Sequence, residues 1–170
     1  NVTDGGVKTI SVDMGEPILD SVEIPAISEK LQLINEPIEI DGETVNITCV
    51  SMGNPHTVIF VDDVTKIHIE KQGPAIEHYS IFPRRTNVEF VEVVSKGLLK
   101  MRVWERGAGE TLACGTGACA SLVAGVINGL CNRKATLELT GGELEIEWDD
   151  KNNHVYMTGE ATFVFEGETV

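Results

Sequence analysis

The residue of this sequence best suited to chemistry is Cys114, which lies between two glycine-rich turns and directly before a run of small residues. Gly115 and Gly117 follow it, and glycine permits close backbone approach. The small residues favour a helix, whose first N–H groups lack intrahelical partners and carry partial positive charge. A thiol held there is easier to ionise, and the same N–H groups can bind a carboxylate. Cys114 is therefore a candidate base, with a buried structural thiol as the alternative.

The other three cysteines favour structural roles. Cys119 lies inside the expected helix, Cys49 lies in an expected strand, and Cys131 follows the helix. Four residues separate Cys114 from Cys119, but no second pair of cysteines or histidines at ligand spacing accompanies them. The sequence therefore predicts no metal site.

A second group of candidate residues lies in the segment Gly53-Asn54-Pro55-His56. It falls between two expected strands, which predicts a tight loop at a strand end. Asn54 can offer an amide to a ligand, and His56 carries a side chain that titrates near neutral pH. The alternative is a plain turn, because Asn-Pro is a common turn dipeptide.

A third group combines Asn87 with the adjacent pair Glu105 and Arg106. Asn87 opens one apolar strand, and Glu105 and Arg106 close the next, so we expect them to converge on one rim. Beside a reactive thiol, Glu105 could tune or orient a partner, and Arg106 could grip a carboxylate in bidentate fashion. A turn residue and a surface charge pattern are the alternatives.

Strands and tight turns must position most of these residues. Three strong hairpin signals stand at Asp41-Gly42, Ser95-Lys96-Gly97 and Gly141-Gly142. Alternating or short apolar runs predict strands over residues 7–13, 31–40, 44–50, 57–61, 87–94, 98–104, 135–139, 144–148, 154–157 and 161–165.

Only two segments have helical character. Thr116–Asn128 is rich in Ala, Leu and Val and stops at Asn128-Gly129, whereas Lys66–Tyr79 is interrupted at Gly73-Pro74, with Pro74 suited to a first helical turn. A helix with so few polar residues as 118–127 is usually enclosed. We therefore expect an α+β fold in which a curved, mostly antiparallel sheet wraps around a central hydrophobic helix.

Composition limits the class of protein. The 170 residues suffice for one well-cored domain or two small lobes. A net charge of −14 argues against nucleic acid or an anionic membrane as the main partner. Residues 1–12 lack the basic start and apolar core of a signal peptide, no apolar run approaches the roughly 20 residues of a membrane span, and four cysteines are too few for a disulfide scaffold. The sequence predicts a cytoplasmic protein.

Four segments in order resemble diaminopimelate epimerase: 14–17 (Met-Gly-Glu-Pro), 53–56 (Gly-Asn-Pro-His), 86–90 (Thr-Asn-Val-Glu-Phe) and the long motif 105–120 around Cys114. The resemblance implies one lobe of a two-lobed fold, with a catalytic cysteine from each lobe. Residues 1–6 are expected to be an inter-lobe linker and residues 7–154 the C-terminal catalytic lobe. Residues 155–170 are expected to form a terminal strand that packs on the N-terminal lobe.

The resemblance also implies an activity: an isomerase of lysine and peptidoglycan precursor biosynthesis that interconverts LL- and meso-diaminopimelate without pyridoxal phosphate or metal. Two cysteines act as the two bases, and Cys114 resembles one of them. No second motif of this kind is present, so we expect this polypeptide alone to be inactive. A homodimer is left open. The positions that match ligand-binding residues of the family are Asn54, Asn87, Glu105, Arg106, Gly115 and Thr116, and those that match residues tuning the cysteines are His56 and Glu105.

Two other functions stay open at this point. One is a racemase or isomerase of the same superfamily that acts on another substrate, such as proline or a hydroxy acid. The other is a non-catalytic binding module that keeps the fold. Loss of turnover on replacing Cys114 would separate the catalytic functions from the binding module.

Overall fold

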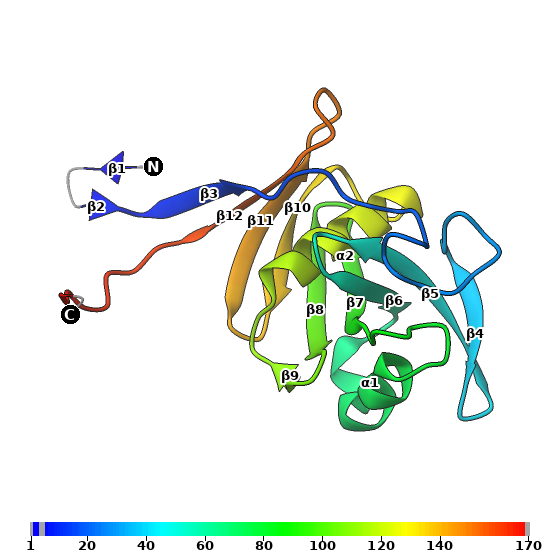
Figure 1. Cartoon of the computed structure of the whole chain (residues 1–170). Helices are drawn as coiled ribbons and strands as arrows, with labels where there is room; N and C mark the ends of the chain where they lie inside the picture. Colours follow the sequence, from blue (N-terminus) through cyan, green and yellow to red (C-terminus); the bar gives the residue numbers. More distant parts are fainter. Residues whose placement is uncertain (1, 4–5, 169–170) are drawn as a thin grey trace.

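The structure is a computed structural model that describes residues 2, 3 and 6–168, and Figure 1 shows its elements in chain order. The elements are β1 (Val2–Thr3), β2 (Gly6–Val7), β3 (Thr9–Asp13), β4 (Glu36–Ile40), β5 (Glu43–Ser51), β6 (Pro55–Val61), the 3₁₀ turn η1 (Val64–Lys66), α1 (Ile69–Glu77), β7 (Asn87–Ser95), β8 (Leu98–Glu105), β9 (Gly109–Thr111), α2 (Gly115–Ile127), β10 (Lys134–Leu139), β11 (Gly142–Trp148) and β12 (Val155–Glu160).

Ten of the described strands form one mixed sheet in the order β3-β12-β11-β10-β8-β7-β6-β5-β4, with β9 paired to β8. The three hairpins expected from turn signals are present as β4–β5, β7–β8 and β10–β11. Two neighbouring pairs run parallel instead, β6 with β7 and β8 with β10. The expected α+β fold with a curved, largely antiparallel sheet is confirmed. The parallel pair of β6 and β7 positions two side chains of the candidate site described below.

Helix α2 is the central hydrophobic helix that the sequence predicts. Every residue from Gly117 to Gly125 is buried. These residues pack into a core with apolar side chains of β5 to β8 and β10 to β12, so the sheet supplies the enclosure that an all-apolar helix requires. Asn128 caps its C-terminus, and Gly129 follows with a φ of 72°, a left-handed value that favours glycine. Neither α-helix of the described part has the length and apolarity needed to cross a membrane.

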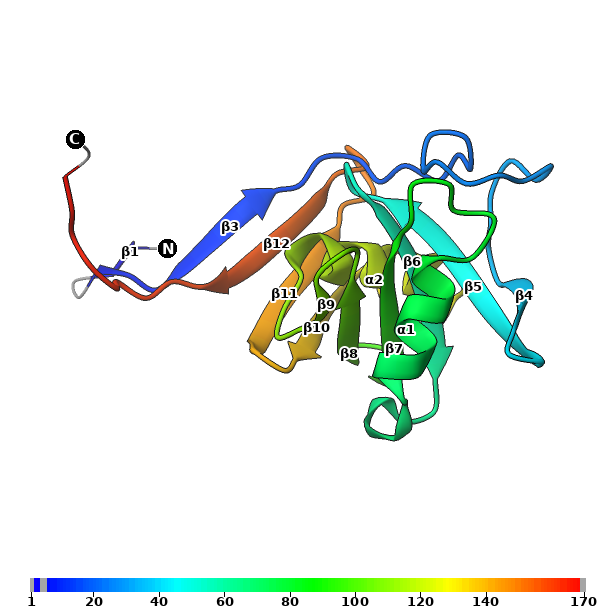
Figure 2. The ribbon, with the colours of Figure 1, turned by 60° about the horizontal axis from the view of Figure 1, so that its bottom comes forward.

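Helix α1 covers the other face of the central strands, as Figure 2 shows. The sequence places Pro74 in a first helical turn after an interruption, and this prediction is wrong, because α1 begins at Ile69 and runs through Pro74. Burial explains why the helix tolerates the lost backbone bond: Ile69 and Ile76 anchor it in the second core. Gly73 lies so close to β8 that a Cβ there would stand 2.5 Å from Trp104 Cγ.

Several strand boundaries differ from the sequence expectations. Residues 31–35 are not part of β4, and residues 161–168 form no regular element, so the strand expected over 161–165 is absent. Phe163, Val164 and Phe165 are exposed, which removes the burial that would hold an apolar run in a sheet. The short strand β9 was not expected; it forms because residues 106–108 turn the chain back onto β8.

Strands β3 and β12 run side by side and extend from the body of the molecule toward both chain ends (Figure 1). Residues 155–158 also pair with β11, so β12 continues the main sheet. Of the expected linker 1–6, residues 1, 4 and 5 lie outside the described residues, as do 169 and 170 of the terminal segment. The proposed division of the chain at residues 6 and 154 stays a prediction.

Candidate active site

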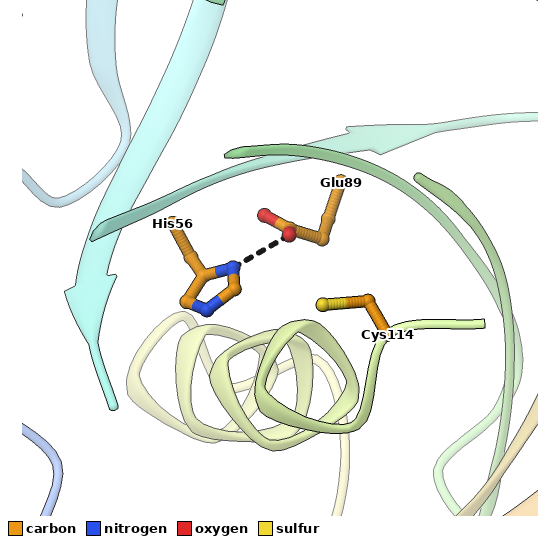
Figure 3. A group of neighbouring side chains, drawn as sticks. All are labelled: His56, Glu89 and Cys114. Carbon is orange, nitrogen blue, oxygen red and sulfur yellow. Dashed lines mark hydrogen bonds and ion pairs between the residues drawn. The ribbon is translucent and has the colours of Figure 1, made fainter. Parts of the chain in front are cut away.

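Cys114 lies at the centre of a buried cluster with His56 and Glu89, drawn in Figure 3. One donor atom from each side chain lies within 4.8 Å of the others. His56 comes from β6, Glu89 from β7, and Cys114 is the residue that caps the N-terminus of α2. His56 and Glu89 are fully buried, and Cys114 is 8% exposed. Two neighbouring strands of the sheet and the start of α2 therefore hold the three side chains.

The parallel pairing of β6 and β7 brings His56 and Glu89 together. In this register His56 stands opposite Asn87, and Val58 stands opposite Glu89. Because strand side chains alternate between faces, His56 and Val58 of β6 share the α2 face with Glu89 of β7. The intervening residues point into the second core around α1. The first part of each strand is thus buried on both faces, so its polar side chains, such as His56 and Glu89, need partners inside the protein.

His56 was expected in a loop, and the structure corrects this: the strand begins at Pro55, and the turn is confined to residues 52–54. Its Nδ1 lies 2.6 Å from Glu89 Oε1, and its Nε2 lies 3.0 Å from Asn54 Oδ1. Each ring nitrogen therefore faces an oxygen atom, and the ring donates to both oxygens only as an imidazolium. Asn54, which the sequence analysis groups with His56, thus orients the His56 ring.

Glu89 is the part of this cluster that the sequence analysis missed. Its Oε2 is buried and has no hydrogen-bond partner among the described residues. Burial raises the pKa of the Glu89 carboxyl, and the contact with His56 opposes this effect. The available signal was an acidic residue within the apolar strand 87–94, where an unpaired carboxylate is costly.

Gly117 lets the first turn of α2 approach Glu89 closely. A Cβ at this position would stand 2.8 Å from Glu89 Oε1 and 3.3 Å from Cys114 Sγ. Any larger residue must displace the carboxylate or the helix. Gly117 therefore allows Glu89 to pack against Cys114. This is the close backbone approach that the sequence analysis expects of the glycines after Cys114.

The thiol of Cys114 is not easier to ionise in this chain, contrary to the sequence expectation. Burial is the main cause that raises its pKa, and the negative charges of Glu89 and Glu105 add to it. The hydroxyl of Thr116, with Oγ1 3.5 Å from Sγ, and the N–H of Gly117 act in the opposite direction. Desolvation therefore outweighs the favourable field of the helix start.

The rim expected from Asn87 and Arg106 is present. Asn87 Nδ2 donates to the carbonyl of Pro55 at 2.8 Å, and its Oδ1 accepts from the backbone N–H of Arg106 at 2.9 Å. The amide thus ties the start of β6 to the turn after β8. The Arg106 side chain is exposed and donates from Nη1 to the carbonyl of Arg84 at 3.2 Å. Glu105 accepts from Thr111 Oγ1 at 2.5 Å, across the β8–β9 hairpin.

A buried carboxylate from α1 fixes the same turn. Glu77 Oε1 accepts from the backbone N–H of Gly107 at 3.0 Å and from Arg85 Nη1 at 3.1 Å. Its Oε2 accepts from the indole N–H of Trp104 at 2.7 Å. The turn that carries Arg106 is therefore held from two sides, by Asn87 and by Glu77.

Gly115 and Thr116 form the first turn of α2 beside Cys114, and both are half-buried. A Cβ at Gly115 would stand 3.0 Å from Met157 Sδ, so β12 packs directly against the helix start. The structure therefore gathers Cys114, Gly115 and Thr116 at one helix end, where His56 joins the cluster of Cys114, and Asn54 contacts His56. Asn87, Arg106 and Glu105 line the adjacent turn.

His56, Glu89 and Cys114 are also of the types that ligate metal ions. Two donors on one zinc ion stand roughly 3.3 Å apart, as follows from tetrahedral bonds of about 2.0–2.1 Å. The 2.6 Å between His56 Nδ1 and Glu89 Oε1 is shorter and matches a hydrogen bond. The spacing of this pair therefore favours a shared proton over a shared metal ion.

Comparison with known proteins places these residues in a family. The sequence model of the family "Diaminopimelate epimerase" matches residues 48–164. The chain is 61% identical over 167 residues to a diaminopimelate epimerase of Acetivibrio thermocellus, covering 98% of this chain and 60% of that protein. It is 56% identical to one of Methanococcus maripaludis over the same shares of the two chains. The chain thus spans about 60% of the length of these relatives.

Solved structures of more distant proteins share the fold. One is a hydroxyproline epimerase from Agrobacterium vitis, solved with bound trans-4-hydroxy-L-proline, with a TM-score of 0.65 at 12% identity. The match covers 94% of this chain and 52% of the epimerase chain. Another is a probable proline racemase from Agrobacterium radiobacter, solved with bound carbonate, with a TM-score of 0.67 at 13% identity. The match covers all of this chain and 56% of the racemase chain. Identities this low establish the sheet-and-helix architecture alone.

Proposed function

The chain belongs to the diaminopimelate epimerase family, and on that premise we propose that it forms one catalytic lobe of an enzyme that interconverts LL- and meso-diaminopimelate. In this proposal Cys114 is one of two acid–base thiols, and no pyridoxal phosphate or metal takes part. The observation that carries the proposal is the position of Cys114. It caps the helix whose first N–H groups can bind a carboxylate, and it stands within 4.8 Å of donor atoms of His56 and Glu89.

The chemistry required is the removal and return of a weakly acidic α-proton. The N–H groups of Gly115 and Thr116 are placed to hold the α-carboxylate where negative charge develops. Arg106, on the turn fixed by Asn87 and Glu77, is an exposed cation suited to a second carboxylate. Cys114 Sγ, as the thiolate, takes the α-proton, and a thiol from the N-terminal lobe delivers a proton to the opposite face. Inversion follows because the two thiols lie on opposite sides of the α-carbon.

Exposed apolar side chains on β3 and on the irregular segment after β12 support a further part of the enzyme as the packing partner. Ile10 and Val12 of β3 are 52% and 41% exposed, and Phe163 to Phe165 are more than three-quarters exposed. Apolar side chains gathered in this way mark interaction surfaces. We assign this surface to contacts with the N-terminal lobe, as the expected packing of residues 155–170 requires.

The experiment that tests the function uses the full-length protein, LL-diaminopimelate and deuterated solvent. We expect deuterium to enter the α-carbon as the meso form appears. Cys114→Ala should abolish formation of meso product from LL substrate and of LL product from meso substrate. Cys119→Ala, five residues on and enclosed in α2, is the matched control and should keep most of the activity. Full turnover by Cys114→Ala would refute the assignment of Cys114.

The substrate is tested separately with a panel that includes proline, hydroxyproline and other amino acids. Preference for diaminopimelate supports the proposal. Efficient exchange at the α-carbon of proline, with none on diaminopimelate, would mean that the enzyme uses the same two-base chemistry on another class of substrate. Absence of exchange on the whole panel would favour the binding module that keeps the fold.

A further inference from the structure

Glu89 is as fully buried as His56, and the function proposed above gives it no role in the reaction. Its side chain is fully buried, Oε1 is bound to His56, and Oε2 has no partner among the described residues. A native protein rarely leaves a buried carboxylate oxygen unpaired, because its desolvation is costly. A carboxylate with free lone pairs, in one cluster with an ionisable thiol, can accept a proton.

We propose that Glu89 stores the proton that Cys114 gives up when it becomes a thiolate. In the resting cluster Cys114 is a thiol, His56 an imidazolium and Glu89 a carboxylate. The S–H bond breaks, the electron pair stays on Sγ, and a new O–H bond forms on the Glu89 carboxyl. His56 keeps both of its protons and then stands between a thiolate and a neutral acid.

The electrostatics of burial favour this internal transfer. The three groups carry no net charge before the transfer and none after it. Release of the thiol proton to solvent would instead leave the buried cluster with one net negative charge, which the protein interior disfavours. Burial raises the pKa of the Glu89 carboxyl above its usual range, so this carboxyl holds a proton more readily than an exposed one does.

The geometry allows the transfer without rearranging the fold. The donor atoms of the three groups lie within 4.8 Å of one another, a span that a bridging water or a small side-chain rotation covers. Other titratable groups near the thiol are Glu105 and Cys119. Glu105 is bound to Thr111 in the β8–β9 hairpin, and Cys119 is enclosed in α2. Glu89 is the carboxylate that shares the cluster with Cys114, whereas the family resemblance points to Glu105.

The test measures ionisation of Cys114 directly, in the full-length protein and without substrate. Alkylation by iodoacetamide requires the thiolate. Its rate at Cys114 is followed by peptide mass spectrometry over a range of pH. In Glu89→Gln the stored-proton site is lost, so alkylation at neutral pH should slow by about tenfold or more, the factor for one pKa unit. The midpoint of the pH profile should move upward.

The sign of this shift separates the proposal from a purely electrostatic role. If Glu89 acted only as a nearby negative charge, its removal would ease ionisation and speed alkylation. Faster or unchanged alkylation in Glu89→Gln therefore overturns the proposal. Glu89→Asp keeps a carboxyl and should restore part of the rate. Glu145→Gln removes a carboxylate that pairs with Lys134 at the surface, and it should leave alkylation of Cys114 unchanged.

A second measurement needs no variant at Glu89 and so survives a folding defect. Infrared spectroscopy of the unaltered protein should show the carbonyl stretch of a protonated carboxyl rising together with the thiolate. Cys114→Ser should lack this coupled change. Thiolate formation without the carboxyl signal would overturn the proposal. The inference rests on the proposed role of Cys114 as a base, but both measurements omit substrate, so their failure would leave the epimerase proposal standing.

Discussion

Replacing Glu77 with glutamine should destabilise the protein, although the two side chains have nearly the same shape. The Glu77 carboxylate accepts three hydrogen bonds, from the indole of Trp104, the backbone N–H of Gly107 and the guanidinium of Arg85, and His78 Nδ1 lies farther away, 3.9 Å from Oε2. A carboxylate accepts with both oxygens, whereas an amide accepts with one and donates with the other atom. In either orientation of the substituted amide, an N–H must face at least one of these donors.

The magnitude follows from which donor is left unpaired. A buried donor without a partner costs about 1–3 kcal/mol. The Arg85 contact adds at most about 1 kcal/mol, because its side chain is 48% exposed and solvent screens the charge. We therefore expect Glu77→Gln to lower the free energy of unfolding by about 1–4 kcal/mol.

Urea unfolding of the full-length protein, followed by tryptophan fluorescence, measures this change. Glu145→Gln is the control, because Glu145 pairs with Lys134 at the surface and both side chains are about half exposed. Its unfolding free energy should change by no more than about 0.5 kcal/mol. A Glu77→Gln variant as stable as this control would refute the reasoning that three donors require a carboxylate.

Two further variants test other parts of the fold. Gly73→Ala should lower the unfolding free energy by about 1–3 kcal/mol, because the new methyl group falls 2.5 Å from Trp104 Cγ; a rise in thermal stability, the usual result of alanine in a helix, would contradict this. Asp63 has its pKa lowered from 3.8 to about 2, chiefly by the Thr65 hydroxyl and then by Lys66. Its contribution to stability should be complete above its unfolded pKa and lost as pH falls toward about 2. Asp63→Asn should flatten the pH dependence of the urea midpoint in this range, and an unchanged slope would argue against it.

Local turn chemistry accounts for the parts of the fold that the sequence predicts well. The Asp41-Gly42 turn places both residues at positive φ, 53° and 84°, which a tight hairpin requires and few other residues accept. The composition of α2 likewise predicts an enclosed helix, because so apolar a segment has no polar face for solvent. Tertiary contacts decide the rest. Among the described residues no strand pairs with the apolar run 161–165, and α1 passes through Pro74 because buried isoleucines hold it.

The sequence predicts the site only in part, because some of its features are local in the sequence and others depend on tertiary contacts. A cysteine followed by glycines and small residues is a local pattern, and Cys114 does cap α2. An acidic residue in an apolar strand marks Glu89 as unusual, but its partner depends on the pairing of β6 with β7, which joins residues 33 positions apart. The burial of Cys114 also depends on distant elements, which is why the expected ease of ionisation is wrong for this chain.

The parallel register of β6 and β7 has a consequence for how faithfully the chain folds. A slip of one position would turn Glu89 away from His56 and into the apolar layer that holds Phe90. An unpaired charge buried there costs several kcal/mol, so mispaired forms of this sheet are penalised more heavily than an all-apolar strand would penalise them. The His56–Glu89 pair thus adds an electrostatic penalty against a shifted register to the one that the apolar side chains already impose.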